Sequence, residues 1–309
     1  MDRRAFLAAA AAVPLSLRAD TRPPLALVTA DKEAAVVLVD AASGRLVRRI
    51  STRPGPRSIE RVGEHSLVAH TAYGEVTLLE GTTVKAVVGG FGEPRYTAAA
   101  PGGRHAFVTD SGRGEVAVLD VLRARVVARV ALGGPARHVS IDRAGRTLWV
   151  ALGSRAREAA IVDVTRPLRP RHVGTIRPPF LLHDVGLVPG TGHVWVTSGD
   201  RGTLAVYDGR TGRVVRRLAA GAPPQHVTFE RGRAFVTSGD DGTLRVHALA
   251  DGRVLRETRV PVGSYNVQWG PGLILTPSLD EGTLCVVDTA GRLLQRVRVA
   301  RSSHDACFM

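Results

Sequence analysis

Pairs of adjacent polar residues recur along the chain at intervals of about 40 residues, and they include most of the groups that could do chemistry. The seven pairs are Arg57-Ser58, Arg95-Tyr96, Arg137-His138, His183-Asp184, Gln225-His226, Tyr265-Asn266 and His304-Asp305. Gathered in one place, such groups could hold an anion, a metal ion or a polar small molecule. The candidate ligand-binding residues are therefore Arg57, Arg95, Tyr96, Arg137, His138, His183, Asp184, His226, Tyr265, His304 and Asp305.

The histidines of these pairs are candidate metal ligands, because imidazole suits zinc, copper and iron. They are His138, His183, His226 and His304. No HxH or HExxH motif fixes their separation, so a metal ion is one candidate cofactor and the sequence does not name it. The chain has no CxxCH motif, which excludes covalent c-type haem.

Two of the pairs join a histidine to an aspartate and could supply acid–base groups to an enzyme. They are His183-Asp184 and His304-Asp305. Adjacent residues of a strand point to opposite sides, so a working His–Asp dyad would have to form between neighbouring structural units. The alternative is that these polar residues are only solvated, or that they link one unit to the next by hydrogen bonds.

Short alternating runs between turn residues show which elements carry these pairs. Residues 177–218 contain HDVGLV, HVWVTS, TLAVYD and GRVVRRL, separated by Gly-rich and Asp-rich turns. Such runs predict four antiparallel strands joined by tight turns. Each polar pair stands at the start of a first strand. A single sheet of this kind leaves both of its apolar faces exposed, so it must pack against further sheets of the same kind.

The copies are visible as a repeat with a period near 40 residues. An acidic residue ends the third strand of each predicted unit, with an alanine in one place: Asp40, Glu80, Asp120, Asp163, Asp208, Ala248 and Asp288. Seven four-stranded units of this length predict an all-β, seven-bladed β-propeller over residues 20–309. The fourth unit is irregular, and we expect it to have a longer hairpin loop and a longer outer strand.

The two ends of the chain are predicted to share one blade. The first unit begins directly at its second strand, PLALVTA, and the C-terminal RSSHDACFM is similar to the start of the fifth unit, LLHDVGL. The C-terminal strand should therefore complete blade one, which removes the unpaired edges of an open ring.

Three segments, AFVTDSGRGEVAVLD, VWVTSGDRGTLAVYD and AFVTSGDDGTLRVHA, resemble the YVTN-type (YncE-like) propeller repeat. The resemblance covers about residues 22–309 and implies the seven-bladed fold. Proteins with this repeat include exported proteins, one of them reported to bind single-stranded DNA, and lactonases; virginiamycin lyases are more distant. The resemblance carries no catalytic residue over to this chain.

Residues 1–19 have the pattern of an export signal. Paired arginines in Arg3-Arg4-Ala5-Phe6-Leu7 precede an uncharged run and a small residue at Ala19, which is similar to a twin-arginine signal peptide. We expect export from a bacterial cytoplasm to the periplasm, cell surface or medium. The uncharged run is short for a transmembrane helix, so we expect no span in the mature chain.

The formal net charge of +14 comes almost entirely from arginine, since lysine occurs only at Lys32 and Lys85. Many of the arginines alternate with Val and Leu in the predicted outer strands. Charged residues on an edge strand block pairing between molecules, which explains them without a nucleic-acid groove. The low aromatic content, 5%, also leaves few stacking platforms for single strands.

These observations predict an exported binding or scaffold protein whose polar central mouth binds a small polar or anionic ligand, a metal ion or a protein partner. The alternatives are a lactonase- or lyase-type enzyme that uses the same mouth, and single-stranded nucleic-acid binding. We expect a monomer. The two cysteines, Cys285 and Cys307, form no disulfide framework.

Overall fold

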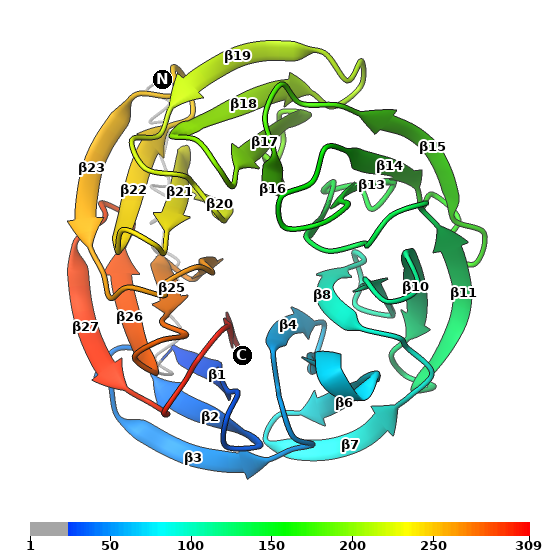
Figure 1. The fold of residues 1–309 in the computed structure, drawn as a ribbon. Helices are drawn as coiled ribbons and strands as arrows, with labels where there is room; N and C mark the ends of the chain where they lie inside the picture. Colours follow the sequence, from blue (N-terminus) through cyan, green and yellow to red (C-terminus); the bar gives the residue numbers. More distant parts are fainter. Residues whose placement is uncertain (1–23) are drawn as a thin grey trace, which may run out of the picture.

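The computed structural model describes residues 24–309, and these form seven four-stranded antiparallel sheets arranged in a ring (Figure 1). This confirms the predicted all-β, seven-bladed propeller. The one helical element among the described residues is a single 3-10 turn, η1 (Thr71–Tyr73). No helix in this part of the chain is long and apolar enough to cross a membrane.

Each blade runs from an inner strand at the central channel to an outer strand at the rim, and blades are numbered in chain order. The inner strands of blades 1 to 7 are β28 (Ala306–Phe308), β4 (Ser58–Val62), β8 (Pro94–Ala99), β12 (Val139–Ile141), β16 (Leu182–Leu187), β20 (Val227–Glu230) and β24 (Gln268–Gly270). The second strands are β1 (Leu25–Ala30), β5 (His65–His70), β9 (His105–Asp110), β13 (Thr147–Ala151), β17 (His193–Ser198), β21 (Arg233–Ser238) and β25 (Leu273–Pro277).

The third strands are β2 (Ala35–Asp40), β6 (Glu75–Glu80), β10 (Glu115–Asp120), β14 (Ala159–Asp163), β18 (Thr203–Asp208), β22 (Thr243–Ala248) and β26 (Thr283–Asp288). The outer strands form the circumference in Figure 1 and are β3 (Leu46–Ser51), β7 (Thr83–Val88), β11 (Arg125–Ala131), β15 (Arg171–Ile176), β19 (Val214–Ala219), β23 (Val254–Arg259) and β27 (Leu293–Arg298).

The acidic repeat residues have a local reason in the turns that follow the third strands. Oδ1 of Asp208 accepts hydrogen bonds from the backbone N–H groups of Arg210 and Thr211, at 3.0 and 2.7 Å. Oδ1 of Asp40 accepts from Ala42 and Ser43 in the same way. Because an Asp side chain that bonds the backbone two or three residues ahead stabilises a turn, this column of the repeat specifies the hairpin between third and outer strands.

Blade 1 is built from both ends of the described chain. β28 pairs antiparallel with β1, with Ala26 opposite Phe308 and Val28 opposite Ala306. The side chain of Phe308 lies against Gly270 of blade 7, where an added Cβ would come within 2.0 Å of Cδ2 of the ring. A glycine is therefore required at this position by the close approach of the closing strand.

Blade 4 shows one expected irregularity and lacks another. The loop between its second and third strands, residues 152–158, is longer than the corresponding loop 111–114 of blade 3. Its outer strand β15 has 6 residues, the same as most other outer strands, so the expectation of a longer outer strand was wrong. The extra residues lie in the loops, including residues 164–170 between β14 and β15.

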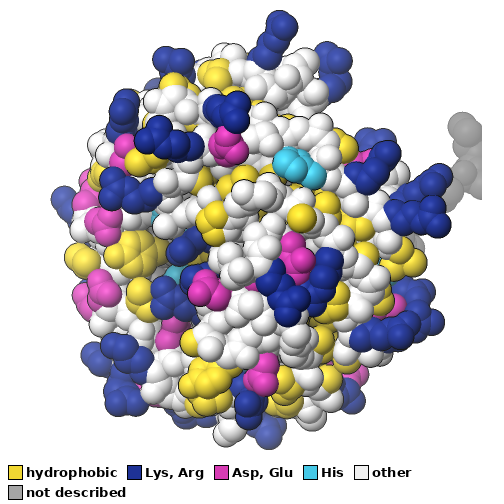
Figure 2. Space-filling view, turned by 45° about the vertical axis from the view of Figure 1, so that its right-hand side comes forward, with side chains coloured by type: hydrophobic (Ala, Val, Ile, Leu, Met, Phe, Trp, Pro, Cys, Tyr) yellow, Lys and Arg dark blue, Asp and Glu magenta, His cyan; other side chains and the backbone are white. Residues whose placement is uncertain are grey.

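The core lies between neighbouring sheets, and the rim is polar. Residues such as Trp149, Phe107 and Phe235 are fully buried between blades, whereas outer strands such as β3 are mostly exposed. Figure 2 shows Lys and Arg side chains scattered among acidic and hydrophobic ones over the visible face. Several outer-strand arginines form ion pairs with carboxylates of their own blade, as Arg296 does with Glu281 at 2.6 Å.

Candidate functional site

The polar pairs all lie at the start of the inner strands, but the structure places their two members at different levels of the channel. A cavity of about 1040 Å³ occupies the channel. It is lined by the second member of every pair: Ser58, Tyr96, His138, Asp184, His226, Asn266 and Asp305. The first members, among them Arg57, Arg95, Arg137, His183, Tyr265 and His304, are not part of this lining. The alternation of side chains along a strand is the reason for this division.

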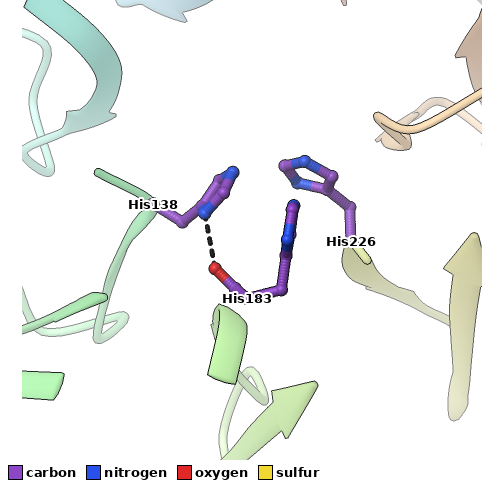
Figure 3. A group of neighbouring side chains, drawn as sticks. All are labelled: His138, His183 and His226. Atoms are coloured by element: carbon purple, nitrogen blue, oxygen red, sulfur yellow. Dashed lines mark hydrogen bonds between the residues drawn. The ribbon is translucent and has the colours of Figure 1, made fainter. Parts of the chain in front are cut away.

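Three histidines from three consecutive blades lie close together at the channel, and two of them, His138 and His226, also line the cavity (Figure 3). His138, His183 and His226 come from blades 4, 5 and 6, and one ring nitrogen of each lies within 4.8 Å of those of the other two. The ring centroid of His138 is 4.7 Å from that of His183 and 4.4 Å from that of His226. His304, the fourth candidate metal ligand, does not belong to this group.

Each of the three histidines has its Nδ1 next to an oxygen that can only accept a hydrogen bond. Nδ1 of His138 donates to the backbone carbonyl of His183 at 2.5 Å, and Nδ1 of His183 donates to the carbonyl of Ser154 at 2.8 Å. Nδ1 of His226 lies 3.4 Å from Oδ2 of Asp184. With the proton on Nδ1, a neutral imidazole presents the lone pair of Nε2, and this is the tautomer that protein oxygens fix in metal-binding histidines.

Burial keeps at least two of these rings neutral. Burial, followed by the charges of neighbouring His226 and Arg137, holds the pKa of both His138 and His183 well below the usual value of 6.5. Nε2 of His138 is also buried and has no hydrogen-bond partner among residues 24–309. An unpartnered buried polar atom costs free energy, so a buried Nε2 without a partner, on a ring packed against two other imidazoles, requires an explanation.

Asp184 connects blade 5 to blade 6 as well as facing His226. Its Oδ1 accepts from the N–H of Val185 at 2.7 Å, and its Oδ2 accepts from the N–H of Val227 on the next blade at 3.1 Å. The His–Asp contact thus forms between blades, as the sequence required of any dyad. It involves Asp184 and His226, because adjacent His183 points away from Asp184.

The second pair, His304-Asp305, makes backbone contacts like those of Asp184, but no histidine of the described chain is paired with its carboxylate. Asp305 accepts from the N–H groups of Ala306 at 2.9 Å and of Ile59 on blade 2 at 3.1 Å. Nδ1 of His304 donates to the carbonyl of Arg57 at 2.9 Å. Burial, aided by the charges of Glu60 and Asp31, raises the pKa of Asp305 well above its usual value. This pair fastens the closing strand to blade 2.

Tyr96 reaches toward the channel axis and packs on the histidines. Its ring centroid is 4.4 Å from that of His138, 5.7 Å from that of His226 and 6.3 Å from that of His304. Burial raises the pKa of Tyr96 to about 12, so its hydroxyl group stays protonated near neutral pH. The tyrosine therefore contributes an apolar ring to the cavity wall and a neutral hydroxyl group beside the histidines.

Tyr265 and the three candidate arginines lie at the face that bears the loops between second and third strands. The hydroxyl of Tyr265 donates to Asp240 at 3.0 Å, and Nε2 of Gln225 donates to the same carboxylate at 2.8 Å. Arg57 pairs with Asp31 at 3.1 Å, and Arg95 pairs with Glu93 at 3.0 Å. These residues form a separate layer, one residue earlier along each inner strand.

Glu60 is a member of the cavity wall that sequence reasoning missed. Its carboxylate accepts a hydrogen bond from Nε2 of Gln268 at 3.3 Å, and burial raises its pKa from 4.5 to about 7. It stands two positions after Ser58 on the same side of β4, so the alternation of the strand could have identified it. The recurring polar pairs stand at or directly before the start of each inner strand, and Glu60 lies beyond them.

Comparisons with known proteins agree on the fold. No protein-family model matches the chain, and no curated protein matches it in sequence. The structure is similar to a chain of hydrazine synthase from Kuenenia stuttgartiensis, with a TM-score of 0.73 and 16% sequence identity over 89% of this chain and 98% of that one. It is also similar to a putative 6-phosphogluconolactonase from Bacteroides fragilis, with a TM-score of 0.75 and 10% identity over 94% and 99%. At such low identity these likenesses show the propeller fold, and membership of the YVTN-type family stays a prediction from the repeats.

Proposed function

We propose that this propeller binds a first-row transition metal ion in its central channel through His138, His183 and His226. The observation that carries the proposal is the arrangement of these side chains. The three imidazoles lie close together, and beside the Nδ1 of each lies an oxygen atom, which accepts a hydrogen bond from His138 and from His183. Hydrogen bonds of this kind fix the orientation of the rings and raise the basicity of the other nitrogen. Imidazole ligands without a thiolate favour zinc or copper(II).

Binding requires the three rings to move slightly closer together. With Zn–N bonds of about 2.0–2.1 Å, two nitrogens on one tetrahedral ion lie roughly 3.4 Å apart. In the structure, one ring nitrogen of each histidine lies within 4.8 Å of those of the other two. Small rotations about the side-chain torsions of the three histidines would cover such a difference without moving the strands.

Three protein ligands leave one coordination position for a ligand from solution, as in zinc sites that bind water or substrate. His138 and His226 both border the cavity of about 1040 Å³, which is large enough for a small molecule. The function that follows is a binding protein in which a metal ion, the Tyr96 hydroxyl and the polar cavity wall hold a small polar or anionic ligand.

The test is metal binding by the full chain, purified without a histidine tag and stripped with a chelator. Titration with Zn²⁺ followed by calorimetry should give one ion per chain, and Co²⁺ should give visible absorption bands of a four-coordinate nitrogen site. His183→Ala and His226→Ala should each lose at least about 10-fold in affinity, because two histidines remain of three.

Two histidines outside the group serve as matched controls. His304→Ala removes a channel histidine that makes a blade contact, and His172→Ala removes an exposed histidine of the rim. Both variants should bind Zn²⁺ as the wild type does. Absence of stoichiometric binding, or equal losses in the control variants, would contradict the proposal.

A second candidate function is lactone hydrolysis in the same cavity, favoured by the contact between Asp184 and His226. A carboxylate that orients a histidine at the wall of a cavity is the arrangement of a general base. Hydrolysis of simple lactones that is present in the chelated wild type and lost in His226→Ala would favour this enzyme. Hydrolysis that appears only with added metal ion would assign the activity to the metal site.

We also propose that the protein acts outside the cytoplasm. The twin-arginine pattern at residues 1–19 supports this proposal, and it lies outside the residues that the structure describes. Nucleic-acid binding has less support, because the rim arginines alternate with exposed valine and leucine and many are paired with carboxylates of their own blade.

A further inference from the structure

Three arginines from blades 2, 3 and 4 lie together at the mouth of the channel opposite the main cavity. Arg57, Arg95 and Arg137 each occupy the first position of a polar pair, where the inner strand begins. Arg57 contacts Asp31 in the loop between β1 and β2, which places this layer at the face of the loops joining second and third strands. Arg95 and Arg137 hold the equivalent position on the next two blades around the ring, so the three side chains start from neighbouring inner strands.

Two of the three arginines are already paired with acidic groups of this face. Asp31 is paired with Arg57 and Glu93 with Arg95, whereas Arg137 forms no ion pair with any carboxylate among residues 24–309. Burial also raises the pKa of Asp31 from 3.8 to about 6, which weakens its charge below neutral pH. On blade 6, at the same face, Asp240 already accepts hydrogen bonds from Tyr265 and Gln225.

Two of the guanidinium groups also retain buried donors. Nε of Arg95 and Nε of Arg137 are buried and have no hydrogen-bond partner within the described part of the chain. The side chains of Arg57 and Arg95 nevertheless keep 33% and 23% of their surface exposed, so a small molecule from solution can reach the layer. An arginine without a carboxylate partner and unsatisfied guanidinium donors at a solvent-accessible mouth are the complement of a small oxyanion.

We propose that Arg57, Arg95 and Arg137 form a binding site for a carboxylate or phosphate group at this mouth of the channel. Guanidinium groups present planar pairs of N–H donors that match two oxygens of such an anion. The anion would neutralise Arg137 and satisfy the two Nε donors. The site uses none of the three histidines as ligands, so it goes beyond the metal proposal and is tested on the chelated chain.

The experiment is calorimetric titration of the chelated full chain with sodium phosphate, and separately with sodium malonate, in a low-salt buffer near pH 7. One equivalent of at least one of these anions should bind. Arg137→Gln should lower the affinity about 10-fold or more, because a charge-assisted hydrogen bond and an unpaired charge are lost together. The tighter of the two anions identifies the natural group as a phosphate or a carboxylate.

Arg104→Gln is the matched control, because Arg104 belongs to the same blade as Arg95, is largely exposed, and pairs with Asp120 rather than with the mouth. It should change the affinity less than about 2-fold. A second readout is the melting temperature: the anion should raise it in the wild type and leave it unchanged in Arg137→Gln. Without anion, Arg137→Gln should melt no lower than the wild type, since it relieves repulsion.

The proposal is overturned if neither anion binds, or if Arg104→Gln weakens binding as much as Arg137→Gln does, which would indicate a general charge effect. His183→Ala should bind the anion as the wild type does. This variant separates the two sites: loss of metal binding with intact anion binding supports both proposals, whereas loss of anion binding in His183→Ala contradicts an independent site.

Discussion

Oδ2 of Asp184 lies 3.4 Å from Nδ1 of His226 and accepts a hydrogen bond from the N–H of Val227 on the same neighbouring blade. One carboxylate thus joins two blades and orients a ring of the three-histidine group. The equivalent carboxylate of Asp305 makes the same two kinds of backbone contact at the closing strand, where it accepts from Ala306 and Ile59. Both aspartates join two blades through backbone contacts, but of the two only Asp184 also lies beside a histidine of the three-histidine group.

Asp184→Asn should lower the affinity for Zn²⁺ by about 10- to 100-fold, because a carboxylate partner raises the basicity of a ligating imidazole and an amide does not. The amide oxygen can still accept from a backbone N–H group, so the melting temperature should change less than the affinity does. Asp305→Asn is the control and should leave zinc affinity unchanged. Equal zinc affinity in Asp184→Asn and the wild type would remove Asp184 from the site.

Phe308→Ala should destabilise the ring by about 3–5 kcal/mol, because it removes a buried aromatic side chain from the contact between blades 1 and 7. Urea unfolding monitored by circular dichroism measures the change. Met309→Ala, at the more exposed neighbouring position, should change the free energy of unfolding by less than about 0.5 kcal/mol.

Deletion of residues 302–309 should be more damaging still, because it removes β28 and leaves the edge of β1 unpaired. We expect a lower melting temperature and a tendency to associate through the open edge, measured by thermal unfolding and light scattering. A truncated chain that melts like the wild type would show that the closing strand contributes nothing to the ring.

Glu60→Gln should stabilise the protein relative to the wild type as the pH rises from 5 to 8. The folded state raises the pKa of Glu60 from 4.5 to about 7, so its stabilising contribution is complete below pH 4.5 and is lost as the pH passes 7. Since the side chain borders the cavity, we expect a difference of about 1–2 kcal/mol. Glu64→Gln, on the same hairpin and 88% exposed, should show no such pH dependence.

Replacement of Arg3 and Arg4 by lysine tests export, because a twin-arginine signal depends on its guanidinium pair. The wild-type chain should be found outside the cytoplasm of a bacterial host and the double variant inside it, as measured by cell fractionation. The same distribution for both chains would contradict a twin-arginine signal, and a cytoplasmic wild type would contradict export.

The number of blades and their order could be predicted from the sequence, because both depend on local chemistry that repeats. Asp208 and its equivalents specify one turn in each unit through backbone contacts two and three residues ahead. The apolar alternation specifies the strands, and the likeness of the last residues to the start of β16 indicated how the ring closes. These features require no knowledge of how the blades are placed relative to one another.

The membership of the site was decided by the tertiary structure. Alternation placed all seven polar pairs at the channel, but it could not show that His138, His183 and His226 meet while His304 does not. The distance between side chains on different blades depends on the radius of the ring, the tilt of each inner strand and the rotamer of each ring. Those quantities arise from packing between whole sheets, so they cannot be predicted from the spacing of residues along the sequence.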